Sequence, residues 1–158
     1  MANVTIYTDG GFSYHEEIGS WGFVSFVNGN EDFTIERYGL VEHHKQTSQV
    51  AEITAILKSL IFCFEEIAQQ NSNVANKLNL TIYSDSQYCV NTINTWMEGW
   101  AKQSWMVDKK NLDLWKQVHA LKHTFKSLSM IWVKGHAGIR LNERVDALTQ
   151  IPLEKYRK

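Results

Sequence analysis

Two short segments of the chain end on an aspartate after almost the same residues. Residues 5–10 read TIYTDG and residues 81–86 read TIYSDS. The β-branched and aromatic residues of both segments predict two strands, and a helical crossover between them would make the strands parallel. If the strands are neighbours in matched register, Asp9 and Asp85 face each other at strand ends about 4.8 Å apart. Open α/β sheets bind ligands at such ends, so the pair is a candidate site.

Two carboxylates this close to each other need a partner for their charge. A shared proton, an arginine or a divalent cation would each reduce their repulsion. Taken singly, Asp9 would also suit the turn that Gly10 and Gly11 predict, and Asp85 would suit the cap of the next helix. The repetition of the segment favours a joint role over these local ones.

Two further acids lie beside the apolar stripes of expected helices. Glu52 lies in the first turn of one helix, where an acid also suits the helix dipole, and its neighbour Ile56 lies on the inward side. Asp146 lies next to Val145 in the segment LNERVDALT. Four carboxylates without a cluster of thiols or histidines favour hard cations, Mg²⁺ first and Mn²⁺ as the alternative. Two such ions ~4 Å apart can act on both oxygens of an in-line phosphoryl displacement.

A loop with a histidine follows the last expected strand. It reads KGHAGIR over residues 134–140, and its glycines would let His136 move. An imidazole can transfer a proton near neutral pH, and simple exposure to solvent is the alternative role for a loop histidine.

Charge is divided unevenly along the chain. Residues 1–85 contain four Lys or Arg against eleven Asp or Glu, and residues 86–158 contain twelve against six. An acidic half that binds cations and a basic half would together suit a polyanionic partner. Random scatter over a solvated surface is the alternative.

Hydrophobic and turn patterns predict one α/β domain. Alternating residues predict strands at 3–8, 21–27, 33–40, 78–83 and 129–134, with a hairpin turn at 28–30. Spacings of three and four residues predict helices that begin after Thr47 and at 86–96, 111–125 and 141–150. We therefore expect a five-stranded mixed sheet, three antiparallel strands and then parallel strands, flanked by helices. Residues 1–150 would form the domain and 151–158 a short polar tail.

Targeting and membrane-spanning signals are absent from the sequence of 158 residues. The N-terminal MANVTIYTDG lacks the segments of a signal peptide, and no apolar run approaches ~18 residues. Cys63 and Cys89 lack metal-ligand spacing, so we expect two buried thiols. These features favour a cytoplasmic protein with no membrane partner, and we expect a monomer.

Five motifs in the chain resemble those of the type 1 ribonucleases H. They are TDGG, TSQVAEITA, YSDSQY, WVKGHAG and NERVDALT, in this order and over about residues 5–149. The resemblance implies a ribonuclease H-like fold. It also implies a metal-dependent endonuclease that uses two Mg²⁺ ions to hydrolyse the RNA strand of RNA–DNA hybrids to 5′-phosphate and 3′-hydroxyl ends. By the same resemblance the metal-binding carboxylates are Asp9, Glu52, Asp85 and Asp146, and His136 assists proton transfer or product release.

The resemblance further implies residues that contact the nucleic acid. Thr47 matches a threonine that holds a DNA phosphate, and Ser48 and Gln49 stand where the family usually has asparagines that read the minor groove. Gln87 matches a glutamine that contacts the RNA strand. The other candidates are the backbone of Gly10 and Gly11, Asn142 beside the site, and Trp96, Trp100 and Lys102.

Two segments depart from the family pattern. The loop after TDGG reads FSYHEEIGS instead of a Gly/Pro-rich sequence. Residues 97–113, where the family usually has a strongly basic protrusion, contain three lysines and three acids, which predicts weaker and less salt-dependent binding. A DNA nuclease or integrase of the same superfamily, or an inactive hybrid-binding module, are the alternatives. The presence of all five motifs and all four carboxylates favours the ribonuclease.

Overall fold

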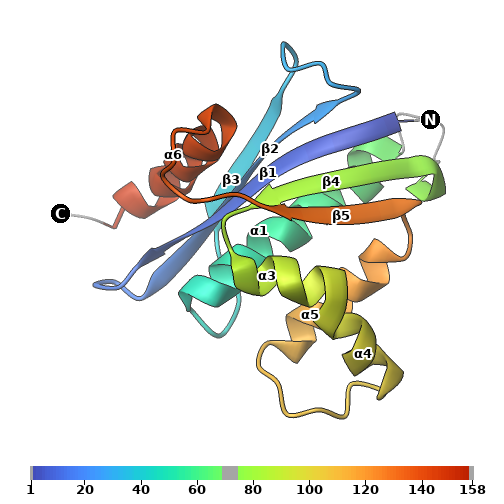
Figure 1. Cartoon of the computed structure of the whole chain (residues 1–158). Coiled ribbons are helices and arrows are strands. Elements are labelled where there is room, and N and C mark those ends of the chain that lie inside the picture. The colour runs from blue at the N-terminus through green and yellow to red at the C-terminus, as the bar shows by residue number, and fades with distance from the viewer. Residues whose placement is uncertain (1, 69–74, 157–158) are drawn as a thin grey trace.

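The structure is a computed structural model that describes residues 2–68 and 75–156. It consists of one mixed sheet with helices on both faces (Figure 1). The strands are β1 (Ala2–Ser13), β2 (Ile18–Val27), β3 (Ile35–Leu40), β4 (Leu78–Ser84) and β5 (Ser127–Trp132). The helical segments are α1 (Ser48–Phe62), η1 (Cys63–Ile67), η2 (Ala75–Lys77), α3 (Gln87–Asn91), η3 (Thr92–Trp96), α4 (Met97–Lys102), α5 (Leu112–Lys122) and α6 (Arg140–Glu154).

The sheet has the predicted mixed topology. Its strand order is β3-β2-β1-β4-β5; β1, β2 and β3 pair antiparallel, and β4 and β5 continue the sheet in parallel from β1. In the centre, Thr5 lies opposite Thr81 and Tyr7 opposite Tyr83. The two similar hexapeptides are therefore neighbouring parallel strands in matched register, which confirms the prediction.

Each face of the sheet carries its own apolar layer. On one face, Ile6 and Ile82 belong to the same buried cluster as Ile53 of α1. On the other face, Val24 of β2 packs in a smaller cluster with Val145 of α6. Since β1 lies between these two layers, side chains from α1, β1 and α6 can meet at one edge of the sheet (Figure 1).

The central strand is longer than predicted. We expected β1 to end at Thr8 and Asp9 to stand at the strand end, whereas β1 continues to Ser13. The extra residues pair with β2, beginning with Asp9 opposite Gly22. The parallel pairing with β4, by contrast, ends at Tyr7. Asp9 therefore lies just past the end of the β1–β4 ladder, and the glycines after it belong to a strand rather than a turn.

Two helices also continue past their predicted ends. The helix that starts at Gln87 was expected to stop at Trp96, but α4 carries it on to Lys102. The last helix was expected to stop at residue 150, but α6 ends at Glu154 and contains Pro152. A buried residue accounts for each extension, because Met97 and Leu153 are both almost fully shielded from solvent and hold these turns against the core.

The cysteines are thiols, as expected. Cys63 and Cys89 are both free and buried, and burial raises the pKa of Cys63 to about 12. Within residues 2–68 and 75–156, no helix has the length and apolar character needed to cross a membrane.

Candidate active site

Helix α1 approaches β1 very closely at Gly10. A Cβ atom on Gly10 would lie 2.4 Å from the backbone nitrogen of Glu52 and 2.5 Å from the carbonyl carbon of Ala51. Only glycine therefore permits this packing. The Gly10 N–H donates to Glu52 Oε1 at 2.5 Å and to Asp9 Oδ1 at 3.0 Å. The contact thus orients two of the predicted carboxylates.

Three carboxylates converge around this contact. Asp9 comes from β1, Glu52 from α1, and Asp85 from the residue that follows β4. Their oxygens lie within 4.8 Å of one another, and Asp9 is only 5% exposed. Each aspartate follows one of the paired tyrosines by two positions, so the register of β1 and β4 brings them to the same place.

Asp146 reaches the group from α6. Its carboxyl lies near enough to that of Asp9 to raise the pKa of Asp9, while Asp9, Glu52 and Asp85 make up the tighter group. Val145 and Leu148, on either side of Asp146 in the sequence, are buried between α6 and the sheet and hold the helix in place. All four acids predicted from the sequence therefore lie at the same edge of the sheet.

The negative charges of this group oppose one another. Burial and then repulsion from Asp85 raise the pKa of Asp9 to about 8, and the nearby Asp146 carboxyl adds to the effect. Burial, followed by the charges of Asp9 and Asp85, raises the pKa of Glu52 well above its usual range. The arrangement therefore needs protons or a bound cation to balance its charge.

The donor set fits a hard divalent cation. Its ligands are carboxylate oxygens, which Mg²⁺ and Mn²⁺ prefer over nitrogen or sulfur. The three carboxylates are held by two strands and a helix, and a cation would remove the repulsion that raises the pKa of Asp9. The identity and the number of ions remain predictions.

The loop between β5 and α6 passes next to Asp85. A Cβ atom on Gly135 would lie 3.0 Å from Asp85 Oδ2. The indole N–H of Trp132 donates to the Asp85 carbonyl at 3.2 Å, which fixes the point where the loop begins. His136 follows Gly135, is exposed, and has a φ of 56°, which is uncommon for a residue other than glycine. His136 is therefore the neighbour in sequence of the residue that touches Asp85. Its role in the reaction remains a prediction.

The start of α1 presents three of the predicted substrate contacts. Thr47 caps the helix, and its hydroxyl oxygen accepts the Val50 N–H at 3.0 Å. The hydroxyl hydrogen of Thr47 stays available to a ligand. Ser48 and Gln49 are exposed in the first turn.

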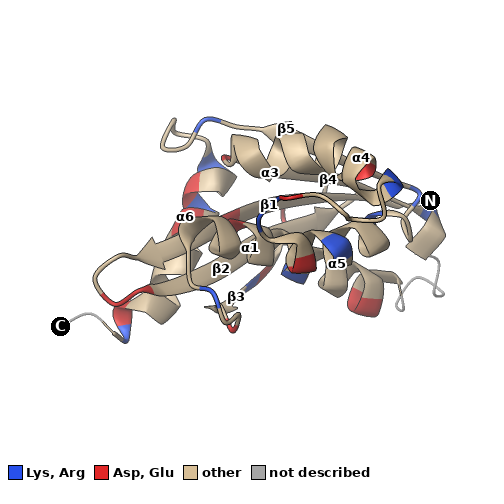
Figure 2. Ribbon diagram, turned by 90° about the horizontal axis from the view of Figure 1, so that it is seen from below, with Lys and Arg blue, Asp and Glu red and all other residues tan. Residues whose placement is uncertain are grey.

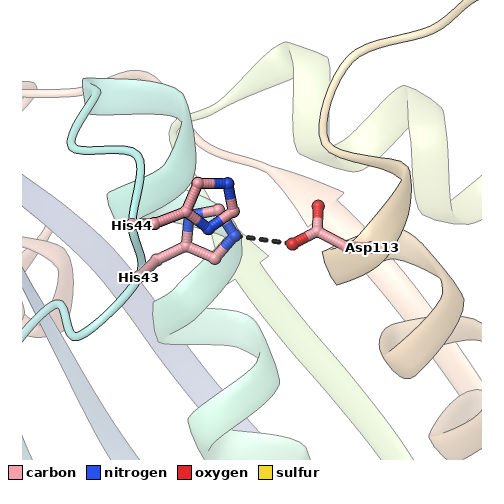
Figure 3. A group of neighbouring side chains, drawn as sticks. All are labelled: His43, His44 and Asp113. Atoms are coloured by element: carbon pink, nitrogen blue, oxygen red, sulfur yellow. Dashed lines mark hydrogen bonds and ion pairs between the residues drawn. The ribbon is translucent and has the colours of Figure 1, made fainter.

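The segment before this turn is fixed to α5. His43 Nε2 lies 2.6 Å from Asp113 Oδ2, and the ring of His44 lies beside that of His43 with centroids 4.2 Å apart (Figure 3). Burial raises the pKa of Asp113, but the hydrogen bond from His43 and its charge outweigh this effect and lower it. The contact holds the entry to α1 next to the helices that follow β4.

A pocket of about 390 Å³ opens beside the first turn of α1. Its lining residues are Gln49, Tyr88, Trp96, Trp100, Lys109 and Lys110. Three of these were predicted as substrate contacts, and Lys109 and Lys110 belong to the segment 97–113 that was expected to bind the nucleic acid weakly, whereas Tyr88 was not predicted. The spacing of Tyr88, Trp96 and Trp100 by eight and four residues places them on one helical face, and this spacing is the sequence signal for Tyr88. The lysines carry no such signal, because a loop brings them to the pocket.

The remaining candidates lie outside that pocket. Lys102 is exposed at the end of α4 and Gln87 is exposed at the start of α3. Gly11 is buried, and a Cβ there would meet Ser20 and Thr149. Asn142 is 3% exposed, and its amide oxygen has no hydrogen-bond partner among the described residues. Substrate contacts of these residues remain predictions.

Charges of both signs occur on α4, α5 and the segment between them (Figure 2). Lys109 and Lys110 follow Asp108, and Asp113 lies in the first turn of α5. Residues 97–113 therefore form a distinct structural feature. Its lysines are partly balanced by the acids beside them.

Comparisons with known proteins add to this geometry. A family model described as RNase H matches residues 1–153. The protein named Ribonuclease H of Treponema denticola is 32% identical over 155 residues, which cover 92% of this chain and 94% of that protein. The Ribonuclease H of Bartonella tribocorum is 33% identical over 159 residues, with 98% and 92% covered. A crystal structure of LC9-RNase H1, described as a type 1 RNase H with the type 2 active-site motif, matches with a TM-score of 0.70 at 20% identity and covers 95% of this chain and 71% of that one. At that identity the structural match bears on the fold alone.

Proposed function

The chain belongs to the RNase H family, and from this membership we propose that it is an endonuclease that hydrolyses the RNA strand of RNA–DNA hybrids to 5′-phosphate and 3′-hydroxyl ends. The observation that carries the proposal is the convergence of Asp9, Glu52 and Asp85 within 4.8 Å, with Asp146 near enough to raise the pKa of Asp9. Acidic groups packed so closely are costly for folding, which argues for a catalytic use of the charge.

The four carboxylates would hold two divalent ions, Mg²⁺ first and Mn²⁺ as the alternative. When bound, such ions activate the attacking water and stabilise the oxygens on both sides of an in-line phosphoryl displacement. The protein's part is to position: Gly10 fixes the carboxylate of Glu52, and the register of β1 and β4 fixes the two aspartates. His136, one residue from the Gly135 contact with Asp85, would move a proton or help the product leave.

The substrate would lie across the start of α1 and the pocket beside it. Thr47, Ser48 and Gln49 offer hydroxyl and amide groups at one end. At the other end, Lys109 and Lys110 offer charges to phosphates beside the indoles of the pocket. Hydroxyl and amide groups are suited to the 2′-hydroxyls and base edges of a wide minor groove, which distinguish an RNA strand from DNA. We propose a monomer, with residues 1–150 as the catalytic unit.

A cleavage assay with four labelled substrates of one sequence tests the proposal. The substrates are an RNA–DNA hybrid, double-stranded RNA, double-stranded DNA and single-stranded RNA, each with Mg²⁺, Mn²⁺ or EDTA. Cleavage of only the RNA strand of the hybrid, and only with metal, is expected. Cleavage of DNA would instead indicate the nuclease or integrase function, and hybrid binding without cleavage would indicate an inactive binding module.

A further inference from the structure

A second group of metal-ligating side chains lies between α4 and α5. His119 lies in the last turn of α5 and His123, four residues later, caps the helix, so the two side chains project from the same face. Their Nε2 atoms lie 3.2 Å and 3.0 Å from the same atom, Oε1 of Glu98 in α4. Each of the three residues offers a ligand atom within 4.8 Å of the other two. None of them belongs to the carboxylate group at the edge of the sheet.

We propose that Glu98, His119 and His123 bind one transition-metal dication, for which Zn²⁺ is the best match. Two imidazoles and a carboxylate are ligands that zinc accepts, and three protein ligands leave one position for water. Tetrahedral bonds of ~2.0–2.2 Å place ligand atoms about 3.3–3.6 Å apart. The two nitrogen–oxygen distances of 3.2 Å and 3.0 Å are about 0.1 Å and 0.3 Å below the lower end of this range. Only small movements would therefore admit an ion.

Lys122 holds the carboxylate of Glu98 in a suitable orientation. Its ammonium group donates to Glu98 Oε2 at 2.9 Å and to the Ile93 carbonyl at 2.7 Å. Lys122 therefore engages Oε2, which is also 3.3 Å from His123 Nε2, and Oε1 is the oxygen that both histidines share. Hydrogen bonds of this kind orient carboxylates in metal sites. On the other side, the ring of Trp105 packs edge-on against His119 with centroids 5.4 Å apart, which limits rotation of the imidazole.

The site is partly exposed to solvent, most of all at His123. The side chains of Glu98 and His119 are 31% and 24% exposed, whereas that of His123 is 55% exposed. An ion would join the first turn of α4 to the last turn of α5, the two helices that flank the segment with Lys109 and Lys110. Occupancy would therefore stiffen one wall of the pocket beside α1. Because Mg²⁺ prefers oxygen ligands, the two kinds of metal would choose different sites.

The group of His43, His44 and Asp113 is less suited to an ion. His43 Nδ1 lies 3.0 Å from the backbone nitrogen of Lys45 and is engaged there, and Nε2 donates to Asp113 Oδ2 at 2.6 Å (Figure 3). This hydrogen bond accounts for the contact without a metal. At Glu98, by contrast, two imidazoles share one oxygen atom.

Calorimetric titration of the full chain with Zn²⁺ tests the proposal, with excess Mg²⁺ present to occupy the carboxylate group. One Zn²⁺ per chain is expected. Replacing both ligands, His119→Ala with His123→Ala, should weaken binding by at least about 100-fold, because even loss of an outer partner costs 10–100-fold. His15→Ala is the matched control, since the side chain of His15 is 97% exposed and lies outside the group. Equal zinc affinity in the double variant and the wild type would overturn the proposal.

A second variant separates metal binding from folding. His123→Gln keeps a hydrogen-bond donor for Glu98 but removes the imidazole, so its circular dichroism and its melting temperature in EDTA should match the wild type. At a Zn²⁺ concentration 100 times Kd, the ratio of folded to unfolded protein should rise about 100-fold in the wild type and in His15→Ala, and much less in His123→Gln. The absence of this rise in the wild type, or an equal rise in His123→Gln, would show that the histidines do not hold the ion.

Discussion

Tyr7 and Tyr83 stack on each other across β1 and β4, with ring centroids 4.6 Å apart and ring planes 9° from parallel. The two residues are also direct partners in the backbone ladder. Asp9 and Asp85 follow them by two positions, so the stacked pair keeps the strands in phase where the carboxylates emerge. A slip of one residue would send one aspartate to the opposite face of the sheet.

Asp9→Asn should nearly abolish hybrid cleavage and should raise the melting temperature of the metal-free protein. Burial and repulsion from Asp85 raise the pKa of Asp9, so its ionised form opposes folding at neutral pH. The neutral amide removes that cost, which we expect to be about 1 kcal/mol or more, since one unit of pKa corresponds to about 1.4 kcal/mol. Cleavage rates with Mg²⁺ and thermal melting in EDTA measure the two effects. A wild-type cleavage rate would remove Asp9 from the site, and a lower melting temperature would contradict the repulsion.

Gly10→Ala should destabilise the protein by about 1–3 kcal/mol, as overpacking of a tight contact does. The new Cβ would lie 2.4 Å from the backbone nitrogen of Glu52, so α1 would have to move and take this carboxylate away from Asp9. Urea unfolding and kcat should therefore decline together. Gly99→Ala is the control, because a Cβ there has nothing within 4 Å and lies in α4, where alanine is the better helix former. A fully active Gly10→Ala protein would show that α1 can retreat without harm to the site.

The edge of the sheet that holds the acids was predictable because the signals for it are local. The repeated hexapeptides gave the register of β1 and β4, and the cap at Thr47 placed Glu52 in a first turn. Both depend on side-chain alternation and capping, which act within a few residues. The continuation of β1 beyond Asp9 was missed because Gly10 and Gly11 resemble a turn, whereas pairing with β2 keeps them in a strand.

The features that the sequence did not show depend on packing between distant elements. Lys109 and Lys110 reach the pocket because α4 and α5 fix the two ends of their loop. The sequence likewise contains no evident histidine cluster, because Glu98 is 21 residues from His119 and only the packing of α4 on α5 brings them together. Helix periodicity describes each helix by itself and does not define which faces will meet.

Glu36→Gln should weaken folding at neutral pH but progressively less in acid. Two hydrogen bonds from Arg144, of 2.7 Å and 2.8 Å, join β3 to α6 and lower the pKa of Glu36 despite its burial. A carboxyl with a lowered pKa stabilises the fold above its unfolded value of 4.5, and this contribution is lost as the pH falls below it. Because both side chains are partly exposed, we expect the pair to add up to about 1 kcal/mol to the free energy of unfolding at pH 7. Urea unfolding at pH 7 and pH 3 measures this contribution, and the exposed Glu154→Gln is the control. If Glu36→Gln lowers the free energy of unfolding equally at both pH values, the contribution is not ionic.

His136→Ala should reduce kcat by up to about 100-fold, at the low end of effects for proton transfer by a side chain. The affinity for Mg²⁺ should stay the same, because the carboxylates come from other residues. Steady-state kinetics and calorimetry with Mg²⁺ separate the two quantities, and the exposed His15→Ala serves as control. An unchanged kcat would leave the loop histidine without a part in the reaction.

Lys109→Gln with Lys110→Gln should raise KM for the hybrid, most strongly at low salt, and leave kcat unchanged. Both lysines line the pocket beside α1, whereas Lys102 is exposed on α4 and lies outside this lining. Each phosphate contact that is lost removes about 0.9 from the slope of log affinity against log salt concentration, so the double variant should lose up to about 1.8. Lys102→Gln has the same change in charge per residue and tests the predicted contact outside the pocket lining, so it should reduce the slope less than each pocket lysine does. Equal effects of Lys102→Gln and of each pocket lysine would mean that general charge, rather than the pocket, attracts the substrate. No effect of any of the three would place the hybrid elsewhere on the surface.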